Sequence, residues 1–436
     1  MSAPAFATEG YFQAGYGTVQ KGVAGAGVAN PADAMAMSIN PAGIVDLPQM
    51  ATIGVSAFMP FRGYTAVGPG FIAPGGASGS LNSNSNFFVM PNGAYVSPID
   101  RDSAWGVAVF GNGGMNTNYP NVLNNAMPGC FGVYCGGSAG VDLKQMFVSV
   151  GYARRFGSFS IGIAPTFAMQ MFSAKGLSFF GFPPQFPGFP PSFSADPFNM
   201  TNNGVDMSFG GGARLGVEWR VTDRLRVGVA GTTPMPMTPF GKYAGLFANA
   251  GRFNIPGSIT AGVAFDVLPT LTVMGEYKHI FYSGPEPIAN ASALIILPFA
   301  GGPGYKMGQW GGPGFGWRDV DVFTVAAEWR ATRDLTLRAG YAHNTNPIRG
   351  TDVTFNLLAP GVVTDHIAAG ASYAISPNAK LDLAATYVPK KTVWGPETTP
   401  FGVNSGRMIG ISMNQWEVSL GFSYRFETAR SVVAKY

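Results

Sequence analysis

The segment QWEVSLGFSYRF, residues 415–426, alternates between two kinds of side chain. Large apolar residues occupy every second position, namely Trp416, Val418, Leu420, Phe422, Tyr424 and Phe426. The positions between them are polar or small, namely Gln415, Glu417, Ser419, Gly421, Ser423 and Arg425. Successive side chains of a β-strand point to opposite faces, so this segment predicts a strand with one apolar and one polar face.

The same period of two recurs along the chain from about residue 49 onward, and counting the segments gives about fourteen strands. The expected spans are 49–62, 87–98, 103–112, 142–156, 158–174, 206–222, 224–236, 255–268, 270–283, 319–332, 334–347, 362–376, 378–389 and 414–426. The polar faces are largely Gly, Ala, Ser and Thr, which suits a lumen better than the charged outer surface of a soluble sandwich.

The connections between these strands alternate between short and long. Short turns are expected at 100–102, 156–158, 222–224, 268–270, 332–334 and 376–378. Long connections are expected at 63–86, 113–141, 175–205, 237–254, 284–318, 348–361 and 390–413. Short periplasmic turns paired with long external loops are typical of bacterial outer-membrane barrels.

Composition supports a membrane location. Only 11% of the residues are charged, against ~25% in a typical soluble protein. Uncharged stretches such as Ala289–Tyr305 are interrupted by proline and glycine before they reach the ~20 apolar residues of a spanning helix. Lipid otherwise admits only closed barrels, because every backbone polar group must be paired. The sequence therefore predicts an all-β fold, a transmembrane antiparallel barrel over residues 49–426 in the bacterial outer membrane.

The first 48 residues lack this alternation and are rich in glycine and alanine. They contain Asn30-Pro31-Ala32 and Asn40-Pro41-Ala42-Gly43, and a proline restricts the residue before it and favours a turn. We interpret residues 1–48 as a plug inside the lumen, with a periplasmic extension as the alternative. Residues 427–436 are expected to form a C-terminal tail. Ala5-Phe6-Ala7 is similar to a signal-peptide cleavage box, which would place the mature start near Thr8.

The stretch Lys21–Gly43, with its Gly-Ala-Gly run and its Asn-Pro-Ala-Gly ending, resembles the hatch of the FadL family. Leu335–Tyr341 also resembles a late strand of that family. The resemblance implies a fourteen-stranded barrel with an N-terminal hatch, and a channel for long-chain fatty acids and other hydrophobic compounds. One departure is that ten residues follow Phe426, where barrels of this class commonly end on an aromatic residue.

The expected function is passive uptake of hydrophobic molecules, with long-chain fatty acids as the first cargo and aromatic hydrocarbons as the alternative. A structural or adhesive barrel is the rival class. Capture is assigned to phenylalanines of the 175–205 connection, namely Phe179, Phe180, Phe182, Phe186, Phe189 and Phe193. Packing between loops is the other interpretation of these rings. Lys175, Lys242 or Lys306 would meet a fatty-acid carboxylate.

Further residues are expected to line or open the lumen. Inward charges that pair with one another and hold the hatch are expected at Arg214, Glu218, Glu276, Lys278, Glu328, Arg338 and Glu417. The gate is assigned to Asn40, Pro41, Ala42 and Gly43 of the hatch. Gly111, Gly113 and Gly114 indicate either a bulge that opens the wall sideways or the start of a loop.

The remaining expectations concern chemistry and partners. Cys130 and Cys135 are close enough in sequence to form a disulfide in an exported chain. His279, His343 and His366 are scattered without metal-ligand spacing, so we expect no enzyme activity, no metal and no cofactor. The net charge of +4 forms no basic cluster, so we expect no nucleic-acid partner. The expected partners are hydrophobic small molecules and outer-membrane lipids, with the barrel acting as a monomer.

Overall fold

The computed structural model describes residues 9–184 and 190–426. The Ala5-Phe6-Ala7 box, Phe186, Phe189 and the tail at 427–436 lie outside the described residues.

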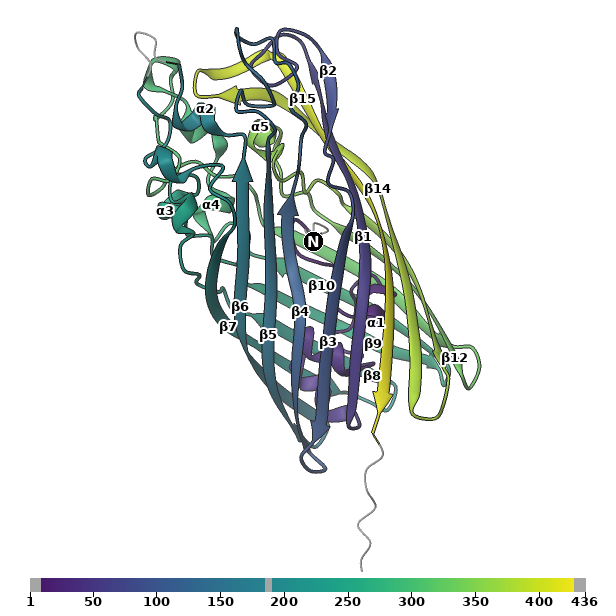
Figure 1. The fold of residues 1–436 in the computed structure, drawn as a ribbon. Helices are drawn as coiled ribbons and strands as arrows, with labels where there is room; N and C mark the ends of the chain where they lie inside the picture. The colour runs from purple at the N-terminus through teal and green to yellow at the C-terminus, as the bar shows by residue number, and fades with distance from the viewer. Residues whose placement is uncertain (1–8, 185–189, 427–436) are drawn as a thin grey trace, which may run out of the picture.

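The chain forms one closed antiparallel sheet, drawn as a tall barrel in Figure 1. Apart from β2, each strand pairs with the next one along the chain, β1 pairing with β3. β1 and β15 close the barrel from Met50↔Arg425 to Val67↔Met408. The short strand β2 pairs with β1 at the end of the sheet order, so fourteen strands make the barrel wall. The predicted fold class and strand count are confirmed.

The strands within the described residues are β1 (Met50–Val67), β2 (Gly79–Asn82), β3 (Phe88–Pro98), β4 (Ser103–Asn116), β5 (Gly140–Phe156), β6 (Phe159–Lys175), β7 (Asp206–Arg220), β8 (Leu225–Thr232), β9 (Ser258–Leu268), β10 (Leu271–Ile280), β11 (Val320–Arg330), β12 (Leu335–Asn344), β13 (Asp365–Ala374), β14 (Ala379–Thr399) and β15 (Gly402–Arg425). The helices are short, namely α1 (Thr18–Lys21), η1 (Ala34–Ser38), η2 (Pro41–Asp46), α2 (Ser178–Gly181), η3 (Pro197–Asn199), η4 (Gly241–Tyr243), α3 (Ala248–Gly251), α4 (Glu286–Ala289), η5 (Ser292–Ile295), η6 (Pro298–Ala300), η7 (Gly350–Asp352) and α5 (Val353–Asn356). In the described part of the chain, no helix is long and apolar enough to span a membrane.

The two faces of the strands differ as the alternation predicts. On β15, Trp416, Val418 and Leu420 are exposed on the outside, while Gln415 and Ser419 are buried toward the interior. Large exposed apolar side chains recur in the same way on the other strands, which suits contact with lipid.

The prediction that residues 390–413 form a long connection is wrong. β14 runs to Thr399 and β15 starts at Gly402, so the two strands form a long hairpin that rises beside β2 (Figure 1). Val393 and Ile411 are strand-forming residues that pair across this hairpin. The hairpin accommodates its irregular positions through two register shifts, one of them at Pro396.

Strand ends differ from the expectation where proline interrupts the ladder. β8 ends at Thr232 instead of residue 236, because Pro234 and Pro236 have no backbone N–H to donate. Other strands are longer than expected. β1 extends to Val67 and β2 follows, so part of the expected connection at 63–86 is also strand.

Candidate functional site

Residues 9–48 lie inside the barrel, where Figure 1 shows them in purple within the lower half of the wall. The helix η2 contacts β5, β6 and β7, while α1 contacts β13, β14 and β15. The segment therefore touches two sides of the lumen that are far apart in the strand order. This position favours the interpretation as a plug over a periplasmic extension, and we refer to residues 9–48 as the hatch.

The Asn-Pro-Ala-Gly segment is fixed to the wall by the Asn40 side chain. The Asn40 oxygen accepts a hydrogen bond from the Ala42 amide at 3.0 Å, which caps η2. The Asn40 amide nitrogen donates to the carbonyls of Val28 at 2.7 Å and Val217 of β7 at 3.0 Å. Pro41, Ala42 and Gly43 are buried behind it. These contacts place the segment as an anchor, and its role as a gate stays a prediction.

Three of the predicted lumen charges form ion pairs or hydrogen bonds with the hatch. Glu417 of β15 forms an ion pair with Lys21, and Lys278 of β10 forms one with Glu9 at 2.8 Å. Glu276 of β10 accepts hydrogen bonds from the backbone amides of Gly27 and Val28, each at 2.9 Å. The lumen wall therefore supplies counter-charges and acceptors for a hatch that could not otherwise satisfy its polar groups away from water.

The other predicted lumen charges are not in contact with hatch charges. Arg338 donates to Glu328 at 2.7 Å across β11 and β12. The guanidinium of Arg214 lies 5.6 Å from the centre of the Tyr16 ring, a cation–π contact. Glu218 is buried beside Gly43, and no described residue hydrogen-bonds its carboxylate oxygens.

The sequence analysis did not identify the charged hatch residues that pair with the barrel wall. The hatch has four charged residues in its described part, namely Glu9, Lys21, Asp33 and Asp46. Asp46 forms ion pairs with Arg155 of β5 and, at 2.6 Å, with Arg220 of β7. A nearly uncharged segment that retains a few charges is the signal that could have identified them, because a buried charge requires a partner.

Small residues let the hatch backbone approach the wall. A Cβ atom at Gly22 would lie 3.1 Å from the Cα atom of Gly370 on β13, closer than ordinary van der Waals contact. The Gly- and Ala-rich composition of both surfaces therefore allows packing of backbone on backbone.

An apolar cavity of about 30 Å³ lies where the external connections converge. It is lined by Tyr134, Val141, Leu177, Phe180, Leu246, Phe247, Pro287, Met307, Pro313, Gly314, Phe315, Phe355 and Leu358. These residues come mainly from five long connections, and none of those lining it carries a charge. We refer to this space as the external cavity.

The phenylalanines assigned to capture fall into two groups. Phe179, Phe180 and Phe193 are buried, and Phe180 lines the external cavity. Phe182 is 54% exposed and packs edge-on against Phe198. Of the described rings in this set, only Phe180 reaches the cavity, so the cluster includes both capture and packing positions.

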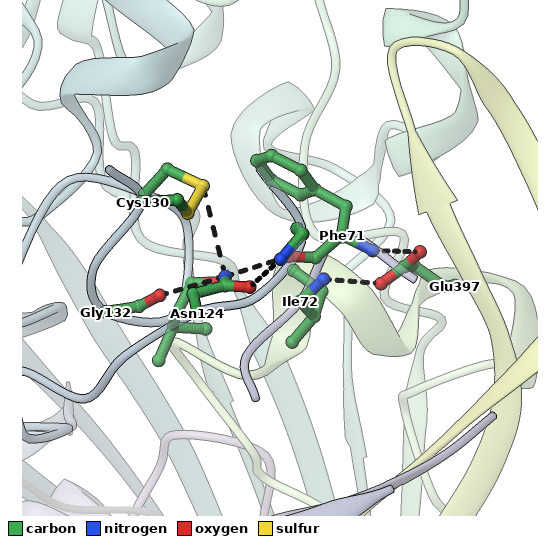
Figure 2. Close-up of a disulfide and its surroundings, with 9 residues drawn as sticks. Phe71, Ile72, Asn124, Cys130, Gly132 and Glu397 are labelled. Carbon is green, nitrogen blue, oxygen red and sulfur yellow. Dashed lines mark hydrogen bonds between the residues drawn. A yellow bond between two sulfur atoms is a disulfide. The ribbon is translucent and has the colours of Figure 1, made fainter. Parts of the chain in front are cut away.

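The disulfide between Cys130 and Cys135 lies beside this region, and Figure 2 shows its surroundings. The Asn124 amide nitrogen donates to the carbonyls of Phe71 at 2.9 Å and Gly132 at 3.1 Å. Asn124 therefore ties the disulfide loop to the connection that follows β1.

The tip of the β14–β15 hairpin holds the same connection from the other side. Glu397 accepts hydrogen bonds from the backbone amides of Phe71 at 2.9 Å and Ile72 at 2.6 Å (Figure 2). The buried Arg407 donates to the carbonyls of Gly68 and Ile72. Phe71 in turn packs against Phe179, with ring centres 4.6 Å apart. The unexpected hairpin thus braces the loops that surround the external cavity.

The strand β4 changes its pairing partner near Gly111, Gly113 and Gly114, the glycines at which the sequence indicated a bulge or a loop. Pairing between β3 and β4 ends at Asn92↔Phe110, but β4 continues along β5 to Asn116, with a register shift between Gly111 and Gly113. Beyond Phe110, the edge of β4 that faces β3 meets the hatch instead. Gly113 forms a bridge with Phe12, and the Gly114 amide donates to the Tyr11 carbonyl at 3.1 Å.

A closed barrel with an apolar outer face, an internal N-terminal segment and apolar external loops defines a protein of the outer-membrane channel class. The chain belongs to the family described as outer membrane protein transport protein (OMPP1/FadL/TodX), whose model matches residues 2–426. It is an outer-membrane protein, as the predicted location states. No curated protein matches the chain.

Solved structures of similar fold cover nearly the whole chain. A FadL homologue of Pseudomonas aeruginosa is 16% identical, with a TM-score of 0.67 over 96% of this chain and 100% of that one. The toluene transporter TodX of P. putida is 17% identical, with a TM-score of 0.65 over 95% and 99%. The toluene transporter TbuX of Ralstonia pickettii is 17% identical, with a TM-score of 0.63 over 95% and 99%. At these identities the likeness concerns the fold.

Proposed function

We propose that this channel takes up small hydrophobic compounds from outside the cell, with aromatic hydrocarbons as its first cargo and long-chain fatty acids as its second. The observation that carries the proposal is the external cavity, which is lined by apolar side chains of the external connections. Dilute hydrophobic molecules bind where they leave water for an apolar surface. No chemistry on the cargo is part of the proposal.

The lining of the external cavity favours an aromatic hydrocarbon over a fatty acid as the cargo. A carboxylate taken out of water needs a cation or several hydrogen-bond donors. Lys175, Lys242 and Lys306 do not line the cavity. The Lys242 side chain donates instead to the carbonyl of Val205 at 2.8 Å. Solved relatives of similar fold include two toluene transporters, which agrees with an aromatic cargo.

Binding requires the external loops to move. A cavity of about 30 Å³ holds little more than one water molecule, so a benzene-sized ring must displace side chains that now fill the space. The helices in the surrounding loops are only three or four residues long, and such loops rearrange more readily than the barrel wall. The disulfide, and the hydrogen bonds that Glu397 accepts from the Phe71 and Ile72 amides, hold one side of the external cavity in place while the other side adjusts.

We further propose that the cargo leaves sideways between β3 and β4. The support is the loss of pairing beyond Phe110 and the register shift at Gly111 and Gly113. A hydrophobic molecule that leaves there passes directly into lipid and avoids the polar periplasmic mouth, which is lined by Arg330, Arg333 and Lys380 among others. In this proposal the hatch, held by its ion pairs, closes the lumen to water.

Crystals soaked with bromobenzene test the cargo proposal, because the bromine atom is located by its anomalous signal. Bromobenzene bound in the external cavity, and absent in crystals of the Phe180→Asn variant, is the expected result. Bromobenzene found only on the lipid-facing surface of the barrel would exclude this cavity as the capture site. A fatty acid bound in the cavity in competition experiments would favour the second cargo.

A further inference from the structure

A polar space of about 800 Å³ lies at the periplasmic end of the barrel, and we refer to it as the periplasmic vestibule. Its lining comes mainly from the ends of β11 to β15 and from the turns that join β11 to β12 and β13 to β14, near the β12 label in Figure 1. Asn30, Pro31 and Ala32 of the hatch also line it. An apolar cargo gains little from such a charged lining, so the vestibule differs in role from the external cavity.

Cationic side chains outnumber acidic ones in the periplasmic vestibule. The lining includes six cations and three acids. Three of the cations have a carboxylate partner, and the pairs are Arg338–Glu328 at 2.7 Å, Arg226–Asp266 at 3.1 Å and Lys380–Asp382 at 3.4 Å. These pairs account for the charges that lie deeper on the strands, and they leave the charges nearest the periplasm to be explained.

The remaining cations are Arg330, Arg333 and Arg425. All three are exposed and line the vestibule, and no described residue forms an ion pair or a side-chain hydrogen bond with any of them. One lining acid, Asp334, is also unpaired among the described residues. Guanidinium groups bind carboxylates through paired, directed hydrogen bonds. The vestibule therefore has the capacity to bind an anionic partner.

The three arginines are too widely spread for one small anion. Arg330 ends β11 and Arg425 ends β15, which is four steps away in the sheet order. Neighbouring strands lie about 4.8 Å apart, so the two positions are separated by roughly 19 Å along the wall. An exposed ion pair contributes little by itself, so affinity requires several pairs at once. A chain that carries several carboxylates meets this requirement, and a single phosphate or carboxylate group does not.

The vestibule also gives access to a weakly anchored part of the hatch. Asn30, Pro31 and Ala32 are partly exposed, whereas the second Asn-Pro-Ala triplet, which begins at Asn40, is buried. The Asn30 side chain makes no hydrogen bond to any described residue, while the Asn40 side chain is held by Val28 and Val217. A chain that entered the vestibule would therefore contact the hatch at residues 30–32.

We propose that the periplasmic vestibule is a docking surface for an acidic, extended segment of a periplasmic protein. Carboxylates of the segment pair with Arg330, Arg333 and Arg425, and the segment lies against residues 30–32 of the hatch. The inference goes beyond the proposed function and does not rest on it, because docking takes place at the periplasmic end and is measured without cargo.

Calorimetry with capped glutamate peptides and the purified full chain at low ionic strength tests the docking. Six residues reach at most ~20 Å when extended and three reach ~10 Å, so hexaglutamate should bind at least tenfold more tightly than triglutamate. Hexalysine should not bind. Equal affinity for the two glutamate peptides would overturn the proposal. Displacement of hexaglutamate by an equal concentration of inorganic phosphate would also overturn it, because the vestibule would then be a site for one small anion.

Replacing Arg330, Arg333 and Arg425 together with Gln should weaken hexaglutamate binding at least tenfold. These side chains are exposed, so their replacement leaves the packing of the barrel intact. Unchanged affinity in this triple variant would overturn the assignment of the vestibule.

The matched control replaces Arg252, Arg318 and Arg349 with Gln. These arginines are also exposed, but they lie in the external connections and do not line the vestibule. Both triple variants remove the same charge from the same residue type, so the control should bind hexaglutamate within twofold of wild type. Equal losses in the two variants would mean that the peptide responds to net charge alone, which would overturn a defined docking surface.

Cross-linking locates the peptide without any variant. Hexaglutamate with a photoreactive diazirine group near its middle should form cross-links to hatch residues 30–32 and to the turns at 332–334 and 376–378. Mass spectrometry identifies the linked residues. Cross-links confined to the external connections would contradict docking in the periplasmic vestibule.

Discussion

Lys21 of the hatch and Glu417 of β15 form an ion pair in which the two side chains are only 3% and 9% exposed. The residues are 396 positions apart in the sequence, so this contact joins the first part of the chain to the last strand. The Thr18 and Ser419 hydroxyls, 2.7 Å apart, reinforce the same junction. The hatch is therefore fixed to the strand that closes the barrel.

Lys21→Met should loosen the hatch, because it leaves Glu417 buried without its partner. Removing one member of a buried ion pair costs about 3–5 kcal/mol. The measurement is hydrogen exchange at the Gly22 amide, which bonds to the Thr18 carbonyl at 3.1 Å. Replacing both residues with Met should restore much of the protection. Lys144→Met is the control, since its pair with Asp142 is more exposed and includes no residue of the hatch. Equal exchange in both single variants would rule out this anchoring role.

Asn40→Ala should release η2 from β7, whereas Asn40→Ser should retain the helix cap and lose only the longer contacts. Each lost contact is worth ~1 kcal/mol, so protection of the Ala42 amide should fall from wild type to Ser to Ala. Asn30→Ala is the control, because Asn30 begins the other Asn-Pro-Ala triplet and its side chain makes no hydrogen bond to any described residue. If Asn30→Ala has the same effect as Asn40→Ala, the triplet acts through its turn and not through the side chain of Asn40.

Phe180→Asn should weaken binding of bromobenzene by about tenfold or more, because it places an amide group in an apolar cavity; tenfold corresponds to about 1.4 kcal/mol. Phe182→Asn should leave the affinity unchanged, since Phe182 is exposed and does not line the cavity. Both positions are phenylalanines of the same connection, two residues apart, so the two variants differ mainly in whether the ring lines the cavity. Equal losses in both variants would show that the Phe-rich connection binds as a surface and not through the cavity.

Gly113→Ala should detach the start of the hatch from the wall. An added Cβ atom at Gly113 would collide with the Tyr11 carbonyl, because the hatch backbone passes directly against it. Exchange at the Gly114 amide should therefore rise. Gly93→Ala on β3 is the control, since a Cβ there has its nearest neighbour at 3.5 Å, an ordinary contact. A protected Gly114 in the Gly113→Ala variant would contradict the bridge between Phe12 and Gly113.

The barrel could be predicted from the sequence because a strand that faces lipid on one side and a lumen on the other carries its pattern locally. The inward and outward residues of β15 follow directly from the alternation in residues 415–426. The hairpin of β14 and β15 could not be predicted beyond residue 389. Its upper part lies beyond the regular alternation, and its stability comes from partners such as Phe71 and Ile72 that are distant in sequence.

The candidate site was predicted only in part, since its contacts join distant segments. The parity of β10 indicated that Glu276 and Lys278 face inward, but nothing local indicates that Gly27 and Glu9 meet them. The glycines at 111–114 signalled an irregularity in β4, and the structure places the hatch against it. The hatch residue Tyr11 packs on the rings of Tyr282 and Trp317, which are distant in sequence, so no local pattern indicates these contacts.

Uptake of dilute labelled toluene by intact Gram-negative cells that lack their own channels of this family tests the central claim most directly. Intact cells are needed because toluene crosses a simple phospholipid bilayer without a protein, by its apolar character alone. Cells that carry the wild-type chain should take up toluene several-fold faster than cells that carry Phe180→Asn at the same surface level. Uptake by wild-type cells no faster than by cells with no channel would contradict the account.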